Sequence, residues 1–162
     1  MSSPRQRVGI GYDSHRFGPD RPLILGGVTI PHSLGLTGHS DADVVTHALI
    51  DALLGAAGAG DIGELFPDTD PAWAGADSLV LLRQAAVRIR ERGYQPVQAD
   101  VTIIAESPKM GPHRAAMAAN LAAVLELAAS AISIKAKTNE GMGWIGRGEG
   151  VAVLAVATVE AS

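Results

Sequence analysis

The sequence predicts an α+β fold, in which strands and helices follow one another along a chain of 162 residues. Segments with apolar residues at every second position alternate with segments whose apolar residues recur every three or four positions. The length is within the usual range for one domain. No internal repeat or low-complexity tail divides the chain. We therefore expect residues 1–162 to form a single domain with a sizeable core.

Composition excludes several classes of protein. Hydrophobic residues make up 47% of the chain and charged residues 19%, which is ordinary for a globular protein. The net charge of −4 argues against nucleic acid as the main partner. The sequence contains no cysteine, so a metal site would need imidazole and carboxylate ligands. We find neither an apolar signal core nor a membrane-spanning run, and we expect no membrane association and a cytoplasmic location.

The expected elements follow from apolar spacing, with glycine, proline and capping residues as punctuation. Gly26-Gly27 between two short apolar runs is typical of a hairpin. The last strand is apolar on both faces, which favours a central or interface position. In chain order we expect a strand over residues 7–15, a loop over 16–21, a hairpin over 23–30, a helix from Asp41 into the glycines of 55–60, a surface loop over 61–71, a helix over 78–92, a strand over 97–105, a Pro- and Gly-rich connection over 106–112, a helix over 113–129, a strand over 132–138 and a strand over 150–160.

The start of the first helix resembles a capping box. Ser40 precedes Asp43 by three residues, just ahead of an apolar run, so we expect Ser40 to be the N-cap. The apolar residues after it follow one core-facing stripe, and His47 lies on a polar stripe beside that. Because the first-turn amides of a helix lack internal partners, the end at His39 and Ser40 is a candidate phosphate seat.

Asp13, His15 and His47 form a candidate metal site. Side chains two apart on a strand point to one face, so the first strand presents Asp13 and His15 side by side. With His47, one carboxylate and two imidazoles make a common ligand set for zinc, with a fourth position open to water or substrate.

A glycine-rich segment suggests a different ligand. Residues 141–146 match G-x-G-x-x-G and follow an expected strand. A dinucleotide site of this type requires a helix that opens at the third glycine, but a β-rich run follows residues 147–150. We therefore predict a strand-to-strand connection that lets the backbone approach a ligand or another subunit.

Several ordered motifs together resemble the 2-C-methyl-D-erythritol 2,4-cyclodiphosphate synthase family of the non-mevalonate isoprenoid route. They cover nearly the whole chain, and their order makes the resemblance specific. They are G-Y-D-S-H-R-F-G at 11–18, L-I-L-G-G-V-T-I-P at 23–31, H-S-D-A-D-V-V-T-H-A-L-I-D-A-L-L-G-A-A at 39–57, G-D-I-G-E-L-F-P-D-T-D-P at 60–71, D-V-T-I-I-A-E-S-P-K-M at 100–110 and G-R-G-E-G at 146–150.

The resemblance implies a two-layer α/β sandwich with a mixed four-stranded sheet, a short hairpin, helices on one face, and a homotrimer with active sites between subunits. It implies a phosphorus–oxygen lyase that cyclises 4-diphosphocytidyl-2-C-methyl-D-erythritol 2-phosphate and releases CMP. It also implies two ions that would assist this reaction. One is a Zn²⁺ in each subunit, and the second is Mg²⁺ or Mn²⁺, held mainly by the substrate phosphates. An isoprenoid diphosphate is a possible ligand of the central channel.

The resemblance also implies roles for particular residues. Asp13, His15 and His47 would hold zinc, His39 and Thr138 would be catalytic, and Trp144 and Arg147 would lie near the central channel. The implied substrate-binding residues are Ser14, Ser40, Asp61, Ile62, Gly63, Phe66, Pro67, Asp68, Thr69, Asp70, Ala105, Glu106, Ser107, Pro108, Lys109, Met110, Gly111, Lys137, Asn139, Glu140, Trp144 and Arg147.

Three alternatives remain open from the residues alone. A zinc hydrolase could use the same three ligands, with Asp43 or Asp51 as the base that activates water. A structural protein could use the histidines inside an assembly core without metal. A dinucleotide-binding module is the third alternative, and it depends on residues 141–146.

Overall fold

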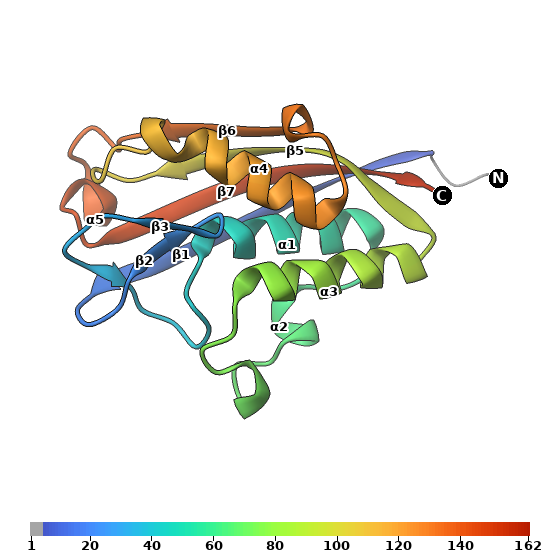
Figure 1. The fold of residues 1–162 in the computed structure, drawn as a ribbon, viewed down its shortest axis with the longest axis horizontal. Coiled ribbons are helices and arrows are strands. Elements are labelled where there is room, and N and C mark those ends of the chain that lie inside the picture. The colour runs from blue at the N-terminus through green and yellow to red at the C-terminus, as the bar shows by residue number, and fades with distance from the viewer. Residues whose placement is uncertain (1–4) are drawn as a thin grey trace.

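The computed structural model describes residues 5–162 and contains a five-stranded sheet in the order β4-β1-β7-β5-β6, with a separate hairpin. Figure 1 shows the long strands of the sheet and the helices that pack beside them. β5 and β6 pair in parallel, and the other pairs are antiparallel, so the sheet is mixed. The strands are β1 (Gln6–Gly18), β2 (Leu23–Leu25), β3 (Val28–Ile30), β4 (Gly35–Leu36), β5 (Tyr94–Ile104), β6 (Ile132–Lys137) and β7 (Gly150–Ala161).

The helical segments follow the first four strands and then alternate with β5, β6 and β7. The α-helices are α1 (Val44–Ala57), α2 (Ile62–Leu65), α3 (Ser78–Glu91), α4 (Arg114–Leu125) and α5 (Gly143–Gly146). Three 3-10 turns, η1 (Pro71–Trp73), η2 (Gly111–His113) and η3 (Ala129–Ala131), adjoin them. None of the helices within residues 5–162 combines the length and apolar character that a bilayer span requires.

The α+β class and the hairpin are confirmed, but the sheet has five strands rather than four. The additional strand, β4, has two residues and pairs with Phe17 and Gly18 at the end of β1. A two-residue strand is too short to show alternation, so the sequence pattern could not reveal it. The pairing also extends β1 through Gly18, where a polar loop was expected.

The helices cover one face of the sheet. α1 crosses β1 and β7, while α3 packs on β5 and α4 on β6. The central position expected for the last strand is confirmed, because β7 lies between β1 and β5. The opposite face carries exposed apolar side chains from β1 and β7, which are Val8, Ile10, Tyr12, Leu154 and Val156.

Two glycines of β1 set the distance between the sheet and α1. A Cβ atom on Gly9 would lie 2.0 Å from the carbonyl oxygen of Ala52, and one on Gly11 would lie 1.9 Å from that of Ala48. The helix therefore lies directly on the strand backbone. Because Asp13 follows on the same face of β1, this approach brings the end of the strand beside the start of α1.

The predicted capping box is wrong. α1 begins at Val44, and Asp43 is the N-cap, whose side chain accepts a hydrogen bond from the Thr46 amide. Ala42, with φ at +57°, breaks the helical path that would have included Ser40. The helix is also buried on nearly all sides rather than along one stripe. Its surroundings explain this, since the sheet, α3 and the hairpin all contact it.

Two connections contain helical turns that the sequence pattern did not indicate. The segment at 61–71, expected as a plain loop, holds α2, capped by Asp61, and η1, capped by Asp70. The Asp70 carboxylate accepts a hydrogen bond from the Ala72 amide at 2.9 Å. The connection at 141–146 contains the one-turn helix α5 before β7 begins. Elements this short show no periodicity.

Candidate metal centre and active site

Asp13, His15 and His47 converge at the end of β1 and the start of α1. Asp13 Oδ2 lies 3.0 Å from His15 Nε2 and 3.1 Å from His47 Nδ1. The two imidazole nitrogens lie 3.3 Å apart. The three side chains are all partly buried, and their ligand atoms form a compact triangle that could hold a metal ion.

The size of this triangle fits a tetrahedral metal. With metal–ligand distances near 2.0–2.1 Å, ligand atoms of a tetrahedral zinc site are about 3.3 Å apart. The three separations of 3.0, 3.1 and 3.3 Å agree with that edge to within a few tenths of an ångström. One carboxylate and two neutral imidazoles leave a divalent ion with a formal charge of about +1, which favours an anionic fourth ligand.

The backbone orients His15 and Asp13. His15 Nδ1 donates to the carbonyl oxygen of Thr37 at 2.8 Å, which leaves Nε2 directed at the triangle. Asp13 Oδ1 accepts from the Ser14 amide at 2.9 Å and leaves Oδ2 for the two imidazoles. In both side chains, the atom that faces away from the centre is therefore already hydrogen-bonded to the backbone, and the other atom is directed at the centre.

His47 is oriented by two hydroxyl groups. Its Nε2 lies 3.0 Å from Ser40 Oγ and 2.9 Å from Ser78 Oγ. Both serines are buried, and Ser78 belongs to α3, which is distant in sequence. Ser40 was predicted as a site residue, whereas Ser78 was not, because only its position at a helix start distinguishes it in the sequence.

The electrostatics of the triangle favour the charged forms of Asp13 and His15. Burial raises the pKa of the Asp13 carboxyl, but hydrogen bonds and charge interactions with His15 and His47 outweigh it and lower the pKa to about 2. Burial lowers the pKa of His15, yet the hydrogen bond and negative charge of Asp13 prevail, so this pKa is raised. A cation at this point would replace protons shared among the three groups.

A cavity of about 500 Å³ opens beside the triangle. The loop before α1 contributes His39 and Ser40 to it, and α2 with the following segment contributes Ile62, Gly63 and Phe66. Pro67 and Asp68 also line this cavity, as do Gly38, Trp73 and Leu81, which were not predicted. The structure thus brings the three candidate ligands together with much of the predicted 61–70 set.

Hydrogen bonds tie the two rims of this cavity together. His39 Nε2 lies 3.1 Å from the carbonyl oxygen of Asp70, and the His39 carbonyl accepts from the Gly75 amide at 2.8 Å. Arg21 donates to the carbonyl oxygens of Gly38 and Ser40. The loop that carries His39 is therefore held on both sides.

Asp61 caps α2, and Thr69 lies exposed in the same segment.

Eight of the remaining predicted residues line a second cavity, of about 370 Å³, whereas Ser107, Asn139 and Glu140 do not. The segment after β5 contributes Ala105, Glu106, Pro108, Lys109, Met110 and Gly111, and the end of β6 contributes Lys137 and Thr138. The Glu106 carboxylate accepts from the Asn139 amide at 2.8 Å and from the Gly141 amide at 3.5 Å. The Glu106 carboxylate therefore holds the loop that contains Glu140. Ser107 lies in the segment after β5, directly before Pro108.

A smaller hollow of about 280 Å³ lies between the end of β1 and α5. It is lined by Ser14, His15, Arg16, Trp144 and Glu149. Arg147 does not line it. The Arg147 guanidinium pairs with the Glu149 carboxylate at 2.9 Å. In the single chain, Trp144 is thus near the triangle and Arg147 is directed to an ion pair.

The structure disfavours Asp43 as the base of a hydrolase. Asp43 is fully buried, and its oxygens accept from the amides of Gly26, Gly27 and Thr46 and from the Thr46 hydroxyl. No lone pair remains directed at a water near the triangle. Asp51 accepts from the Ile62 amide at 2.8 Å, and burial raises its pKa. This bond connects α1 to α2, so Asp51 supports the cavity wall.

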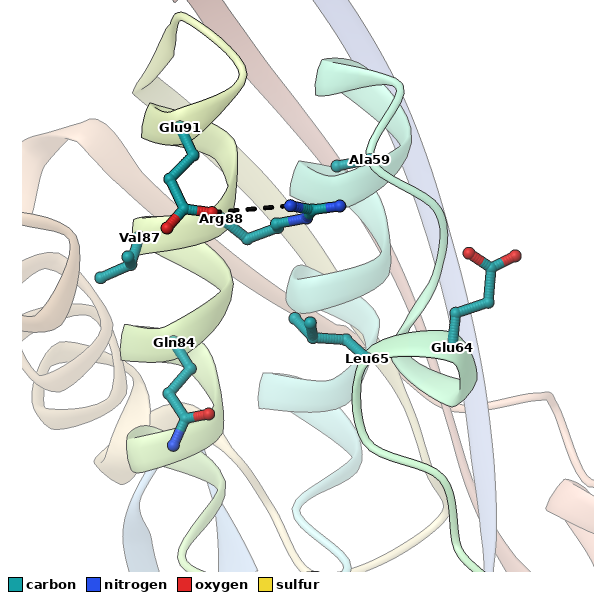
Figure 2. A pocket seen from close by; sticks show the side chains of 7 residues that line it. All are labelled: Ala59, Glu64, Leu65, Gln84, Val87, Arg88 and Glu91. Atoms are coloured by element: carbon teal, nitrogen blue, oxygen red, sulfur yellow. Dashed lines mark ion pairs between the residues drawn. The ribbon is translucent and has the colours of Figure 1, made fainter.

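Another hollow, of about 450 Å³, lies between α3 and the segment that contains α2 (Figure 2). Its charged side chains include Arg88 and Glu91, which form an ion pair at 3.5 Å, and Glu64 on the facing segment. Figure 2 shows the Arg88–Glu91 pair on α3. This hollow contains none of the candidate metal ligands.

Comparison with known proteins decides the family. The model of the YgbB family matches residues 6–160. The chain belongs to the YgbB family. The suspected resemblance is thereby confirmed. Members with the name 2-C-methyl-D-erythritol 2,4-cyclodiphosphate synthase include one from Bordetella petrii, 60% identical over 151 residues, which are 93% of each chain. One from Symbiobacterium thermophilum is 59% identical over 94% of this chain and 97% of its own.

Solved structures of YgbB family relatives have the same fold. A structure of the synthase in a CDP-bound form has a TM-score of 0.86 and 44% identity, covering 95% of this chain and all of the other. The Plasmodium falciparum IspF complex with CDP gives 0.85 at 34% identity, over 99% of each chain. The bifunctional IspDF of Campylobacter jejuni gives 0.93 at 46% identity; it covers 97% of this chain, which spans 42% of the bifunctional chain.

Proposed function

We propose that this protein converts 4-diphosphocytidyl-2-C-methyl-D-erythritol 2-phosphate into 2-C-methyl-D-erythritol 2,4-cyclodiphosphate and CMP. The observation that carries the proposal is the Asp13, His15 and His47 triangle beside a cavity of about 500 Å³, in a chain 60% identical to a synthase of that name. An enzyme with this reaction is a phosphorus–oxygen lyase. We propose that residues 1–162 form its single domain.

The reaction is an intramolecular phosphoryl transfer. An oxygen of the 2-phosphate attacks the β-phosphorus and forms a new P–O bond. The bond between the β-phosphorus and the bridging oxygen breaks, and that oxygen leaves with its electron pair as part of CMP. Such a transfer needs in-line positioning and neutralisation of charge more than covalent help from the protein.

Asp13, His15 and His47 would hold Zn²⁺, which would supply Lewis acidity to a phosphate oxygen in the fourth position. The triangle supports zinc by its edge lengths and its mixed nitrogen and oxygen atoms. We further propose Mg²⁺ or Mn²⁺ as a second ion, which would be held mainly by the substrate phosphates and would neutralise part of their charge. Magnesium usually takes many of its ligands from phosphate and water, so this ion would require few protein groups.

Ser40 and His39 would bind the attacking 2-phosphate. Ser40 Oγ accepts from the Ala42 amide at 3.3 Å and lies 3.0 Å from His47 Nε2. When that nitrogen carries its proton, the Ser40 hydroxyl has its own proton free for an oxygen in the cavity. The contact of His39 with the Asp70 carbonyl would connect phosphate binding to the segment 61–70, which would enclose the methylerythritol carbons.

The second cavity would bind the cytidine. Backbone groups of residues 105–111 would form hydrogen bonds to the cytosine edge, and Lys137, Asn139 and Glu140 would complete the nucleotide side. Thr138 would donate to the phosphates as charge redistributes. The lining of this cavity supports the proposal, since it joins the segment after β5 to the end of β6.

We propose that three chains assemble with their outer sheet faces together and their active sites between neighbours. Ile10 pairs with Val156 and Tyr12 with Leu154 across β1 and β7, and all four are exposed in the single chain. A contiguous apolar face of this kind favours an interface. Trp144 and Arg147 would lie near a central channel between the chains, in which an isoprenoid diphosphate is a candidate ligand.

Incubation of the purified protein with the proposed substrate tests the function. Mass spectrometry should detect CMP and the cyclic diphosphate in equal amounts, and Asp13→Asn should abolish both while the far-ultraviolet spectrum is retained. Release of inorganic phosphate without a cyclic product would instead support the hydrolase. CDP should raise the melting temperature by binding the folded state, and an unchanged melting temperature at saturating CDP would contradict the nucleotide cavity.

A further inference from the structure

A chain of three side chains connects α3 to the candidate metal centre. Ser78 Oγ lies 2.9 Å from His47 Nε2, and the Ser78 hydroxyl donates to Asp41 Oδ1. Asp41 Oδ1 also accepts from the Asp43 amide at 3.1 Å, and Oδ2 accepts from the Ser78 amide at 3.0 Å. Ser78 is fully buried, and His47 is 9% exposed. The chain thus lies within the protein, and neither Asp41 nor Ser78 lines the cavity beside the triangle.

The carboxylate determines which way the hydroxyl points. An ionised carboxylate only accepts hydrogen bonds, so the single Ser78 hydroxyl proton is directed at Asp41. The Ser78 oxygen then presents lone pairs to His47, and it can only accept from the Nε2 proton. With that proton on Nε2, the Nδ1 lone pair is available at the Asp13 triangle.

We propose that Asp41 and Ser78 are positioning residues for the metal centre, which hold the His47 ring in place and keep its proton on Nε2. This inference rests on the proposed metal site. Without the carboxylate, the Ser78 hydroxyl can turn and donate to Nε2. The proton of a neutral imidazole then lies on Nδ1, directed at Asp13, and a metal ion is excluded from that nitrogen.

Ser40 is not equivalent to Ser78 in this arrangement. Both oxygens lie near Nε2, but the structure shows a carboxylate acceptor for the hydroxyl of Ser78, whereas Ser40 lines the cavity. The Asp41 carboxylate therefore fixes the direction of the Ser78 hydroxyl proton before any ligand binds. Asp41 is itself held, because its amide donates to the Ala76 carbonyl at 3.0 Å and its carboxylate accepts the Ser78 and Asp43 amides.

The test measures Zn²⁺ binding by competition with a chromophoric chelator, without substrate. The variants are Asp41→Ala, which removes the acceptor of the Ser78 hydroxyl, Ser78→Ala and the double substitution. Each single variant should bind zinc about 10- to 100-fold more weakly. Because both residues act through one contact, the double variant should lose no more than the weaker-binding single variant. The visible spectrum of the Co²⁺ protein should also change, since the His47 ring is no longer held in one orientation.

Asp77→Asn is the matched control. Asp77 precedes Ser78 and caps α3 by accepting from the Leu79 amide at 2.9 Å, but it has no bond to His47. It should retain wild-type zinc affinity even where its melting temperature falls. Where Asp41→Ala does not fold, Ser78→Ala carries the test, because alanine is tolerated at the first position of a helix.

The outcomes separate this inference from the proposed function. Folded Asp41→Ala and Ser78→Ala proteins with wild-type zinc affinity would overturn it, as would losses that multiply in the double variant. A wild-type protein that binds no zinc would instead refute the metal centre itself. Weakened zinc binding with a changed Co²⁺ spectrum, together with an unaffected Asp77→Asn control, would support the positioning role.

Discussion

Replacing Asp43 by asparagine tests how the hairpin is attached to α1. The carboxylate accepts at Oδ1 from the Gly26 amide at 2.8 Å and from the Thr46 amide at 3.0 Å. At Oδ2 it accepts from the Gly27 amide and the Thr46 hydroxyl, both at 2.8 Å. Gly26 and Gly27 both have positive φ, so the hairpin turn presents two successive amides to one carboxylate.

The cost of Asp43→Asn follows from this geometry. One carboxamide oxygen can replace Oδ1, but the NH₂ group then faces the Gly27 amide, which loses its acceptor. An unsatisfied buried amide costs about 1–3 kcal/mol, and the remaining bonds lose their charge assistance at about 1 kcal/mol. Burial raises the pKa of Asp43, so removing the buried charge offsets part of this. We expect a net loss of about 2 kcal/mol.

Urea unfolding followed by circular dichroism measures this loss. Asp77→Asn is the control, because Asp77 is an exposed N-cap with one amide partner and should lose less than about 1 kcal/mol. Asp43→Ala removes all four acceptor contacts and should cost more than Asp43→Asn. If Asp43→Asn unfolds at the wild-type urea concentration, the carboxylate does not hold the hairpin turn in the way argued here.

Three further substitutions test other parts of the structure. Gly11→Ala should lower the free energy of unfolding by about 3 kcal/mol in urea titrations, because its Cβ would lie 1.9 Å from the Ala48 carbonyl oxygen. Ile10→Glu should convert the proposed trimer to monomers in light scattering, since Ile10 is 70% exposed and its burial is worth roughly 1–2 kcal/mol per subunit. Burial raises the pKa of Asp51, so the folded state gains stability as pH falls through that pKa and loses it as pH rises. Asp51→Asn keeps an acceptor for the Ile62 amide and should reduce this loss, as melting temperatures at about pH 4 and about pH 7 would show.

The strand half of the metal centre could be predicted from sequence alone. Asp13 and His15 are two residues apart in an alternating segment, and they do lie on one face of β1. The position of His47 beside these two residues could not be predicted in this way, because no local pattern specifies which part of a helix lies over which part of a strand. That contact depends on Gly9 and Gly11 against Ala48 and Ala52.

The errors occurred where tertiary contacts outweigh local preference. Ser40 has the right spacing for a capping box, but its hydroxyl lies beside the His47 imidazole, and Asp43 caps the helix instead. Ser78 carries no functional signal in the sequence, since its partner His47 is 31 residues away. The strand β4 and the helix α2 are too short for apolar spacing to indicate them.

Two kinds of contact determine the geometry of the metal centre, and substitutions in them should have different effects. The glycine–alanine contact between β1 and α1 sets where the backbones of Asp13 and His47 lie, to within the reach of a side chain. It does not set the rotation of either imidazole or the position of its proton. Those depend on the Thr37 carbonyl for His15 and on Ser78 for His47. A substitution at Gly11 should therefore weaken folding and metal binding together, whereas one at Ser78 should weaken metal binding in a protein that still folds. A Gly11→Ala protein that is destabilised but binds zinc with wild-type affinity would show that the triangle is formed by the loops rather than by the helix–strand contact.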